Sequence, residues 1–174
     1  MNRIRLKLKN FKTRILKDVV GCTGDVSIWP SVELKPTRGG QIRFLGRATI
    51  KENSFICAAG GSIIIDDYVS INRNACIVSR RSITIGEGTS IGPNVCIYDH
   101  NHRFDGSGHK KNEFRESPIS IGKNVWIAAN CSVLKGAQIG DNCVIGAGCV
   151  INSIIPSNSL VTQERNLKIT PLHD

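Results

Sequence analysis

Residues 121–150 read Ile-Gly-Lys-Asn-Val-Trp, Ile-Ala-Ala-Asn-Cys-Ser, Val-Leu-Lys-Gly-Ala-Gln, Ile-Gly-Asp-Asn-Cys-Val and Ile-Gly-Ala-Gly-Cys-Val, and this stretch decides the fold. Every sixth residue is Ile or Val, and a small or β-branched residue follows four positions later. The positions between them are rich in Gly, Asn and Asp, which are turn residues. This period predicts a short strand and a turn, repeated so that the Ile and Val side chains point inward and stack between successive coils.

The same period continues upstream of this stretch in two registers that lie two residues out of step. One register holds Ile85, Ile91 and Ile97, the other holds Ile65, Ile71, Ile77 and Ile83, and a weaker trace reaches Ile50 and Ile56. The chain of 174 residues contains 24 Ile and 12 Val against 9 Leu and 8 Ala, a balance that favours strands over helices. We therefore expect an all-β solenoid that is well defined over residues 50–156.

The cysteines are expected to be reduced and mostly buried. There are seven of them, an odd number with no Cys-x-x-Cys pair, which argues against a disulfide framework and a zinc ribbon. Cys131 and Cys149 are three units apart, so in a triangular coil they stack one above the other as core filler. The Gly and Asn residues after each Ile are expected at corners where φ is positive.

The repeat is interrupted between Ile97 and Ile121, where a polar segment holds three of the four His residues of the chain. The register resumes in phase, so the insert leaves the stack without shifting it. Polar loops on rigid scaffolds commonly carry function, and His is the natural general base near neutral pH. We therefore place the chemistry in residues 98–118.

The formal net charge of +9 is concentrated at the N-terminus. Residues 1–17 contain seven Lys and Arg and no acid, which leaves 16 basic against 14 acidic residues in the rest of the chain. The segment is amphipathic if helical, and it can cap the β-solenoid, lie on an anionic membrane, or do both. Polynucleotide binding fits poorly, because the basic residues are confined to one tail and aromatic residues make up 5% of the chain. With no apolar run of membrane-spanning length and no signal-peptide core, we expect a cytoplasmic protein.

The repeats, together with Pro118-Ile119-Ser120-Ile121-Gly122-Lys123-Asn124-Val125-Trp126 and the His-rich insert, resemble the hexapeptide-repeat acyltransferases of the galactoside and maltose O-acetyltransferase type. The resemblance implies a left-handed parallel β-helix with a protruding catalytic loop, a homotrimer, and acetyl-CoA as the acyl donor. The left hand comes from the resemblance alone, because parallel crossover connections are otherwise right-handed.

The resemblance also assigns site residues. In this family the catalytic His lies 24 residues before the Trp of the Asn-Val-Trp step and eight after the Asn of a Pro-Asn-Val step, so Trp126 and Asn94 both indicate His102. His100 is the alternative, because the Asp-His-x-His cluster can slip by two residues. A family Asn that assists the reaction matches Asn72.

The cofactor groove follows in the same way. The resemblance places Ala129 and Ala147 in a groove for the pantetheine arm, Trp126 near the thioester, and Asn152 and Ser153 near the end of the groove. The family's closing Gly-x-Pro-Ala-Lys/Arg step is replaced here by residues 163–168, so Arg165 and Lys168 are the candidate phosphate ligands. No metal is expected, because two His one residue apart supply only part of a three-His zinc site.

The sequence thus predicts a basic segment at 1–20, a β-helix at 21–160 and a tail at 161–174. The predicted function is acetyl-CoA-dependent O-acetylation of a sugar hydroxyl, in surface polysaccharide or lipopolysaccharide biosynthesis, with peripheral contact at the inner face of the membrane as an option. The alternatives are an N-acetyltransferase of an amino sugar or nucleotide-linked sugar, and a non-catalytic β-helix scaffold.

Overall fold

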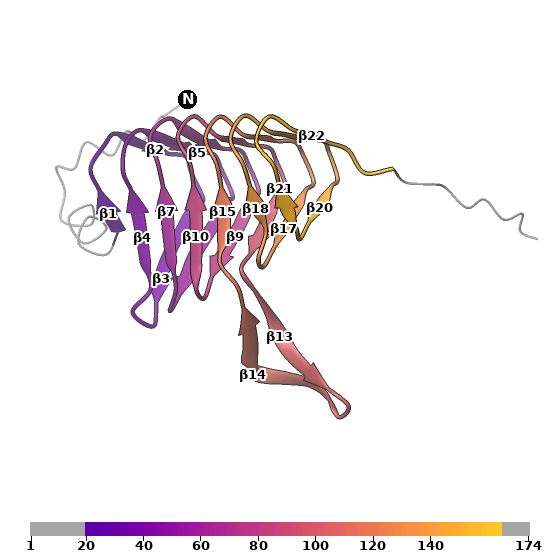
Figure 1. Ribbon diagram of the computed structural model, residues 1–174. Coiled ribbons are helices and arrows are strands. Elements are labelled where there is room, and N and C mark those ends of the chain that lie inside the picture. Colours follow the sequence, from indigo (N-terminus) through magenta and orange to yellow (C-terminus); the bar gives the residue numbers. More distant parts are fainter. Residues whose placement is uncertain (1–19, 165–174) are drawn as a thin grey trace, which may run out of the picture.

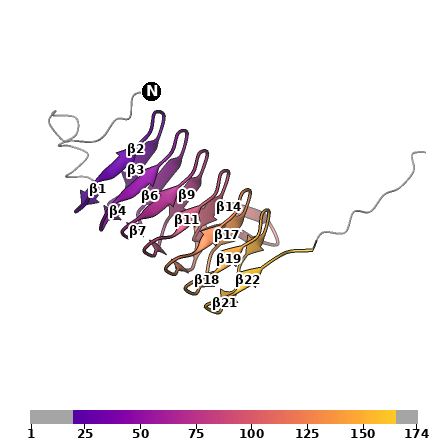
Figure 2. The same cartoon turned by 90° about the horizontal axis from the view of Figure 1, so that it is seen from above.

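The structure, a computed structural model, describes residues 20–164 and forms a three-sided parallel β-helix (Figure 1). Seen from above in Figure 2, the coils lie one behind another in a single row. The basic segment 1–17 and the candidate phosphate ligands Arg165 and Lys168 lie outside the described residues. The described part contains strands and turns and no helix, which confirms the all-β, parallel β-helix prediction. It therefore also contains no helix that could cross a membrane.

Each of the first six coils contributes one strand to each of three sheets, called here face 1, face 2 and face 3, and the last coil adds strands to faces 1 and 2 only. Face 1 consists of β1 (Val20–Cys22), β4 (Gln41–Phe44), β7 (Ser62–Ile65), β10 (Ser82–Ile85), β15 (Ile119–Ile121), β18 (Gln138–Ile139) and β21 (Ile154–Ile155). Face 2 consists of β2 (Val26–Ile28), β5 (Ala48–Ile50), β8 (Val69–Ile71), β11 (Ser90–Ile91), β16 (Trp126–Ile127), β19 (Val144–Ile145) and β22 (Leu160–Val161). Face 3 consists of β3 (Glu33–Thr37), β6 (Phe55–Ala59), β9 (Cys76–Ser79), β12 (Cys96–Tyr98), β17 (Ser132–Leu134) and β20 (Val150–Ile151).

The core is a stack of Ile and Val side chains in the lumen of the three-sided coil. On face 1, Ile63 pairs with Ile83 and Ile83 with Ile119, and all three are at most 1% exposed. Burying one such side chain is worth about 1.5–3 kcal/mol, so the column of inward residues stabilises the coils. The inner positions of the first two coils are filled less regularly, by Phe44, Val26 and Ala48 among others, which is why the repeat is hard to see there.

The two sequence registers have a simple structural origin. The partners Ile63 and Ile83 are 20 residues apart, whereas Ile121 and Ile139 are 18 apart. The upstream coils therefore carry extra residues, and strand β10 points both Ile83 and Ile85 into the core. The two-residue offset in the sequence is a change of coil length and leaves the stack intact.

Asn residues at the corners adopt the left-handed conformation, as expected. Asn74, Asn94 and Asn130 have φ between 57° and 60° and occupy successive coils at the corner between faces 2 and 3. Their carboxamides form a ladder, in which Asn74 Nδ2 donates to Asn94 Oδ1 at 3.1 Å and Asn94 Nδ2 donates to Asn130 Oδ1 at 3.0 Å.

The expected positive φ is found at Gly88, Gly136 and Gly148, three positions after a repeat Ile or Val, but not at the Gly residues directly after the repeat Ile. Gly86 and Gly122 have no positive φ; they stack directly on each other at the corner between faces 1 and 2. A Cβ added to Gly86 would lie 2.6 Å from the carbonyl carbon of Gly122. The close approach of neighbouring coils, and not backbone conformation, explains glycine at these positions.

The cysteines are distributed as predicted. All seven are thiols in the described part of the chain, with Cys57, Cys131, Cys143 and Cys149 buried and Cys22, Cys76 and Cys96 half-buried. Cys131 and Cys149 lie on adjacent coils, because each directly precedes one member of the register pair Ser132 and Val150.

Candidate active site

The interruption of the repeat forms an antiparallel hairpin that projects from the β-helix (Figure 1). Its strands are β13 (His100–Asp105) and β14 (Gly108–Glu116), inserted between β12 on face 3 and β15 on face 1. Strand β12 pairs directly with β17, and β10 pairs directly with β15, so the coils before and after the insert are in contact. The prediction that the insert leaves the stack unshifted is therefore confirmed.

His102 is the third residue of β13 and is exposed. Its Nδ1 is 3.4 Å from the carbonyl oxygen of Lys110 on β14. Because a carbonyl can only accept, this contact requires the proton on Nδ1 and leaves Nε2 with a free lone pair. The ring packs against Phe114, its register partner, with the centroids 4.6 Å apart. A register shift follows directly after His102, so the bulge sets the direction of its side chain.

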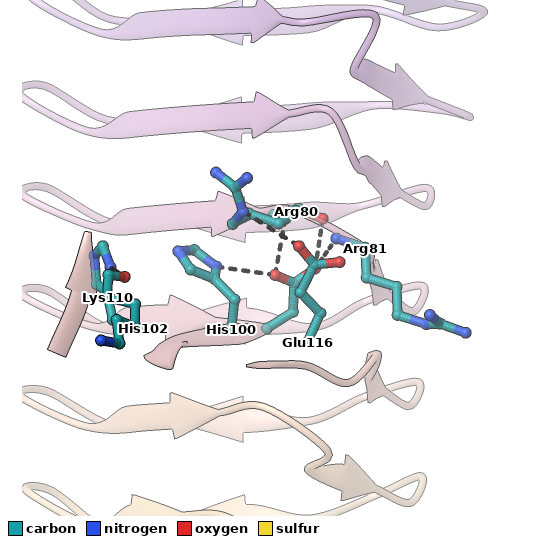
Figure 3. A network of polar contacts seen from close by, with 8 residues as sticks. Arg80, Arg81, His100, His102, Lys110 and Glu116 are labelled. Carbon is teal, nitrogen blue, oxygen red and sulfur yellow. Dashed lines mark hydrogen bonds and ion pairs between the residues drawn. The ribbon is translucent and has the colours of Figure 1, made fainter. Parts of the chain in front are cut away.

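His100 is placed differently, at the root of the hairpin. Its side chain is 14% exposed, and its Nδ1 lies 3.1 Å from Oδ1 of Asp99, which is fully buried. Tyr98 and Phe114 contact the ring edge-on, with centroids at 6.2 and 5.6 Å. Figure 3 shows His100 directed toward the carboxylate at the hairpin root, while His102 lies beside Lys110.

Asp99 was not singled out from the sequence, although it precedes both candidate His residues. Its carboxylate accepts from the Ser79 hydroxyl at 2.7 Å and from the backbone N–H groups of Arg80 and Arg81 at 2.8 Å each. Burial raises the pKa of this carboxyl, but the hydrogen bonds from His100, Arg80, Ser79 and Arg81 outweigh burial and hold the pKa below its ordinary value. Only the Asp-His adjacency was visible in the sequence; the Ser79–Arg81 corner lies one coil away.

The remaining predicted residues fall at two different corners of the coil. Asn72, Ala129 and Ala147 lie at the corner between faces 2 and 3, after β8, β16 and β19 respectively. Asn152 and Ser153 lie after β20, at the corner between faces 3 and 1, which is also the corner that carries the hairpin. Within one chain, the fold does not bring Asn72 next to His102.

The side chain of Trp126 faces outward, and the side chain of Asn72 makes one hydrogen bond to the neighbouring backbone. Trp126 is 55% exposed at the start of β16. Asn72 Oδ1 accepts from the backbone N–H of Arg73 at 2.9 Å, which leaves its NH₂ group as the donor for a ligand. Among residues 20–164, no group of three or more His, Cys, Asp and Glu side chains is arranged to hold a metal ion.

The fold and repeats define the class of the protein: it is a hexapeptide-repeat β-helix. Residues 118–153 match the family model described as bacterial transferase hexapeptide (six repeats). The predicted resemblance is confirmed by curated relatives that carry acetyltransferase names.

The chain is 36% identical over 116 residues to galactoside O-acetyltransferase of Escherichia coli K12, covering 64% of this chain and 57% of that protein. It is also 36% identical over 110 residues to the putative lipopolysaccharide biosynthesis O-acetyl transferase WbbJ of Escherichia coli K12, covering 58% of this chain and 56% of that protein. The chain thus spans a little over half the length of these relatives.

Among solved structures, a maltose O-acetyltransferase from Clostridium difficile 630 is 26% identical with a TM-score of 0.50, covering 88% of this chain and 71% of that chain. The fold is also shared with the hexapeptide-repeat acetyltransferase VCA0836 of Vibrio cholerae, a structure that holds acetyl-CoA. It is 22% identical with a TM-score of 0.54, covering 90% of this chain and 74% of that chain.

Proposed function

We propose that the protein is an acetyl-CoA-dependent O-acetyltransferase in which His102 is the general base on a sugar hydroxyl. The observation that carries the proposal is the exposed imidazole of His102 on a projecting hairpin, with Nδ1 held by the Lys110 carbonyl. This arrangement fixes the tautomer that a base needs. The similarity to galactoside and maltose O-acetyltransferases supports the reaction class.

The reaction requires one proton transfer from the acceptor hydroxyl to His102 and one from His102 to the leaving thiolate. Nε2 of His102 takes the proton of the acceptor hydroxyl as its oxygen attacks the thioester carbonyl carbon. The tetrahedral intermediate then collapses, the carbon–sulfur bond breaks, and the imidazolium returns the proton to the departing thiolate of CoA. Asn72 is the proposed side-chain donor to the oxyanion, through the NH₂ group that its contact with Arg73 leaves free.

The surroundings of the two His residues favour His102 over His100. The ring of His100 is enclosed by Tyr98 and Phe114 and already engages Asp99, so an incoming acceptor has little access to it. His102 is open to solvent, and its ring contacts the Lys110 carbonyl, Phe114 and His109, none of which is a carboxylate.

The division of the site between two corners supports a homotrimer. Face 3 lies between the corner that carries Asn72, Ala129 and Ala147 and the corner that carries the hairpin. In a cyclic trimer that joins the first corner of one copy to the second corner of the next, face 3 of every copy looks toward the threefold axis. We propose that His102 of one copy works with Asn72 of its neighbour.

The outer surface of face 3 has the composition that such an interface needs. From β6 to β20 its outward positions alternate with the inward Ile and Val residues and are apolar apart from Ser132: Phe55, Cys57, Ala59, Cys76, Val78, Cys96, Tyr98, Leu134 and Val150. Outward positions on face 2 are polar in β2, β5, β8 and β11 (Ser27, Thr49, Ser70 and Ser90), whereas its last three strands place Trp126, Val144 and Leu160 outward. An apolar face of this extent favours burial against other copies.

Acetyl-CoA is the proposed donor, and it is proposed to bind along the corner between faces 2 and 3. The small side chains of Ala129 and Ala147 leave room beside the backbone for the pantetheine arm, and Trp126 on the adjoining strand offers a flat apolar surface near the thioester. Asn152 and Ser153 are proposed ligands where the hairpin corner of the neighbouring copy approaches. Arg165 and Lys168 remain the proposed contacts for the phosphates.

The acceptor is proposed to be a saccharide of a surface polysaccharide or lipopolysaccharide precursor, which the similarity to WbbJ supports. We further propose a cytoplasmic protein that touches the inner face of the membrane through residues 1–17. Deleting these residues should abolish co-sedimentation with vesicles that contain anionic lipid while sparing acetyl-CoA turnover. Equal sedimentation of both proteins would contradict the membrane contact.

The central experiment compares His102→Ala with His100→Ala in transfer from acetyl-CoA to a panel of hydroxyl and amine acceptors. Loss of the general base should lower kcat by about 10²–10⁴-fold in His102→Ala. Full activity of His102→Ala together with loss in His100→Ala would reassign the base. Transfer to amines alone would indicate the N-acetyltransferase, and a trimer that neither binds nor turns over acetyl-CoA would indicate the scaffold.

A further inference from the structure

The strongest polar cluster of the described residues lies at the root of the hairpin, where β12 ends and β13 begins (Figure 3). Asp99 is fully buried there, and its two carboxylate oxygens receive four hydrogen bonds. Oδ1 accepts from Arg80 N–H and faces Nδ1 of His100, and Oδ2 accepts from the Ser79 hydroxyl and Arg81 N–H. A buried carboxylate is stable only when it is paired in this way.

These partners come from two separate parts of the fold. Ser79 ends β9 and Arg80 and Arg81 follow it at the corner one coil before the hairpin, whereas His100 is the first residue of β13. The Asp99 carboxylate therefore ties the start of the hairpin to the preceding coil. The exposed hairpin has otherwise few contacts with the hydrophobic core, because its side chains are mostly exposed.

A stack of flat groups links this anchor to His102. The guanidinium carbon of Arg80 lies 3.5 Å from the centroid of the Phe114 ring, and the ring of His102 lies 4.6 Å from that centroid. The edge of His100 contacts the same ring at 5.6 Å. Arg80 Nε also donates to Glu116 Oε1 at 3.3 Å, which fixes the returning strand β14 at the same corner.

We propose that Asp99, acting through His100 and the Phe114 stack, is a positioning residue for the imidazole of His102. The inference rests on the proposed function, since it concerns the placement of the proposed base. Asp99 does not reach the substrate; it fixes the direction in which the hairpin leaves the β-helix. Positioning matters because a displacement of the order of 1 Å in a reacting group can lower a rate by about 10²-fold.

The geometry makes a specific prediction for conservative variants. In Asp99→Asn, one oxygen becomes an NH₂ group that faces a backbone N–H, which cannot accept, so at least one of the four hydrogen bonds is lost. In His100→Gln, the side-chain amide still donates to Asp99, whereas His100→Leu has no donor. His100→Gln should therefore retain the anchor, and His100→Leu should resemble Asp99→Asn.

A matched control exists at another corner of the β-helix. Asp141, which is exposed, accepts through Oδ1 the backbone N–H of Lys123 on the neighbouring coil at 2.7 Å, so Asp141→Asn perturbs an inter-coil bond at the corner between faces 1 and 2, which does not carry the hairpin. A purely structural effect should lower thermal stability in both aspartate variants. An effect on positioning should appear in Asp99→Asn alone.

The experiment measures kcat, KM for acetyl-CoA and the melting temperature of the full-length protein and its variants. We expect Asp99→Asn and His100→Leu to lower kcat by about 10–100-fold with KM for acetyl-CoA within about twofold, His100→Gln to recover most of the kcat that His100→Leu loses, and Asp141→Asn to keep kcat near that of the unchanged protein. Unchanged kcat in Asp99→Asn, or an equal loss in Asp141→Asn, would overturn the inference while the proposed function stands. If His102→Ala remains active, both the base assignment and the inference fail.

Discussion

Replacing Asn94 tests the physical account of the corners and does not depend on any function. Asn94 has φ of 57°, and its carboxamide occupies the middle of the Asn74–Asn94–Asn130 ladder. Asn94→Ala removes the ladder contacts. It also places alanine, which has a Cβ but no polar group to bond the nearby backbone, in the left-handed region. Asn94→Gly removes the same ladder contacts but fits the left-handed region without strain.

The expected magnitudes follow from these two contributions. The ladder bonds are solvent-exposed, at 3.1 and 3.0 Å, so together they are worth about 1 kcal/mol. Left-handed backbone at a non-glycine residue costs about 1–2 kcal/mol. Asn94→Ala should therefore lower the free energy of unfolding by about 2–3 kcal/mol and Asn94→Gly by about 1–2 kcal/mol, since glycine adds some unfolded-state entropy.

Urea denaturation monitored by circular dichroism measures both variants, with the shift in midpoint converted at the common m-value. The decisive quantity is the difference in the free energy of unfolding between Asn94→Ala and Asn94→Gly. If alanine is as stable as glycine, or more stable, backbone conformation does not explain why Asn is at this corner. Asn112→Ala, in the exposed hairpin strand β14, serves as a neutral reference.

Three further predictions concern other parts of the structure. Gly86→Ala places a Cβ 2.6 Å from the carbonyl carbon of Gly122, so calorimetry should show a fall in melting temperature larger than that of Gly106→Ala, whose added Cβ meets open space. The folded pKa of Asp99 is lowered, so its stabilising contribution is present above the unfolded pKa of about 3.9 and disappears as the pH falls through the folded value. Asp99→Asn should therefore be less stable than the unchanged protein at pH 7, and the gap should narrow below about pH 4; a gap independent of pH would contradict this. Burial raises the pKa of the Cys76 thiol, and the proposed trimer also covers it, so mass spectrometry should find slower alkylation of Cys76 at about pH 7.5 than of a small-molecule thiol.

The resemblance to the hexapeptide-repeat acyltransferases, through the family spacing from Trp126 and Asn94, points to one position on the chain, His102, as the proposed base. Spacing does not tell which neighbouring His is enclosed and which is open. The enclosure of His100 depends on Asp99 and on the Ser79–Arg81 corner, which lies 18 to 20 residues upstream of that carboxylate. Arg80 and Phe114 likewise carried no signal, since their contact exists only when β14 returns beside the preceding coil.

The sequence by itself determined the repeating unit, the inward Ile and Val positions, the corner Asn residues and the location of the insert. These features follow from local conformational preference and from a period that each coil repeats, so a single chain segment displays them. The tertiary structure decided that the insert is a hairpin, that corner glycines are needed for contact between coils, and that the predicted residues occupy two corners on either side of face 3. Those properties depend on the distances between successive coils. Stacking of the inward Ile side chains sets these distances, and no local sequence pattern contains them.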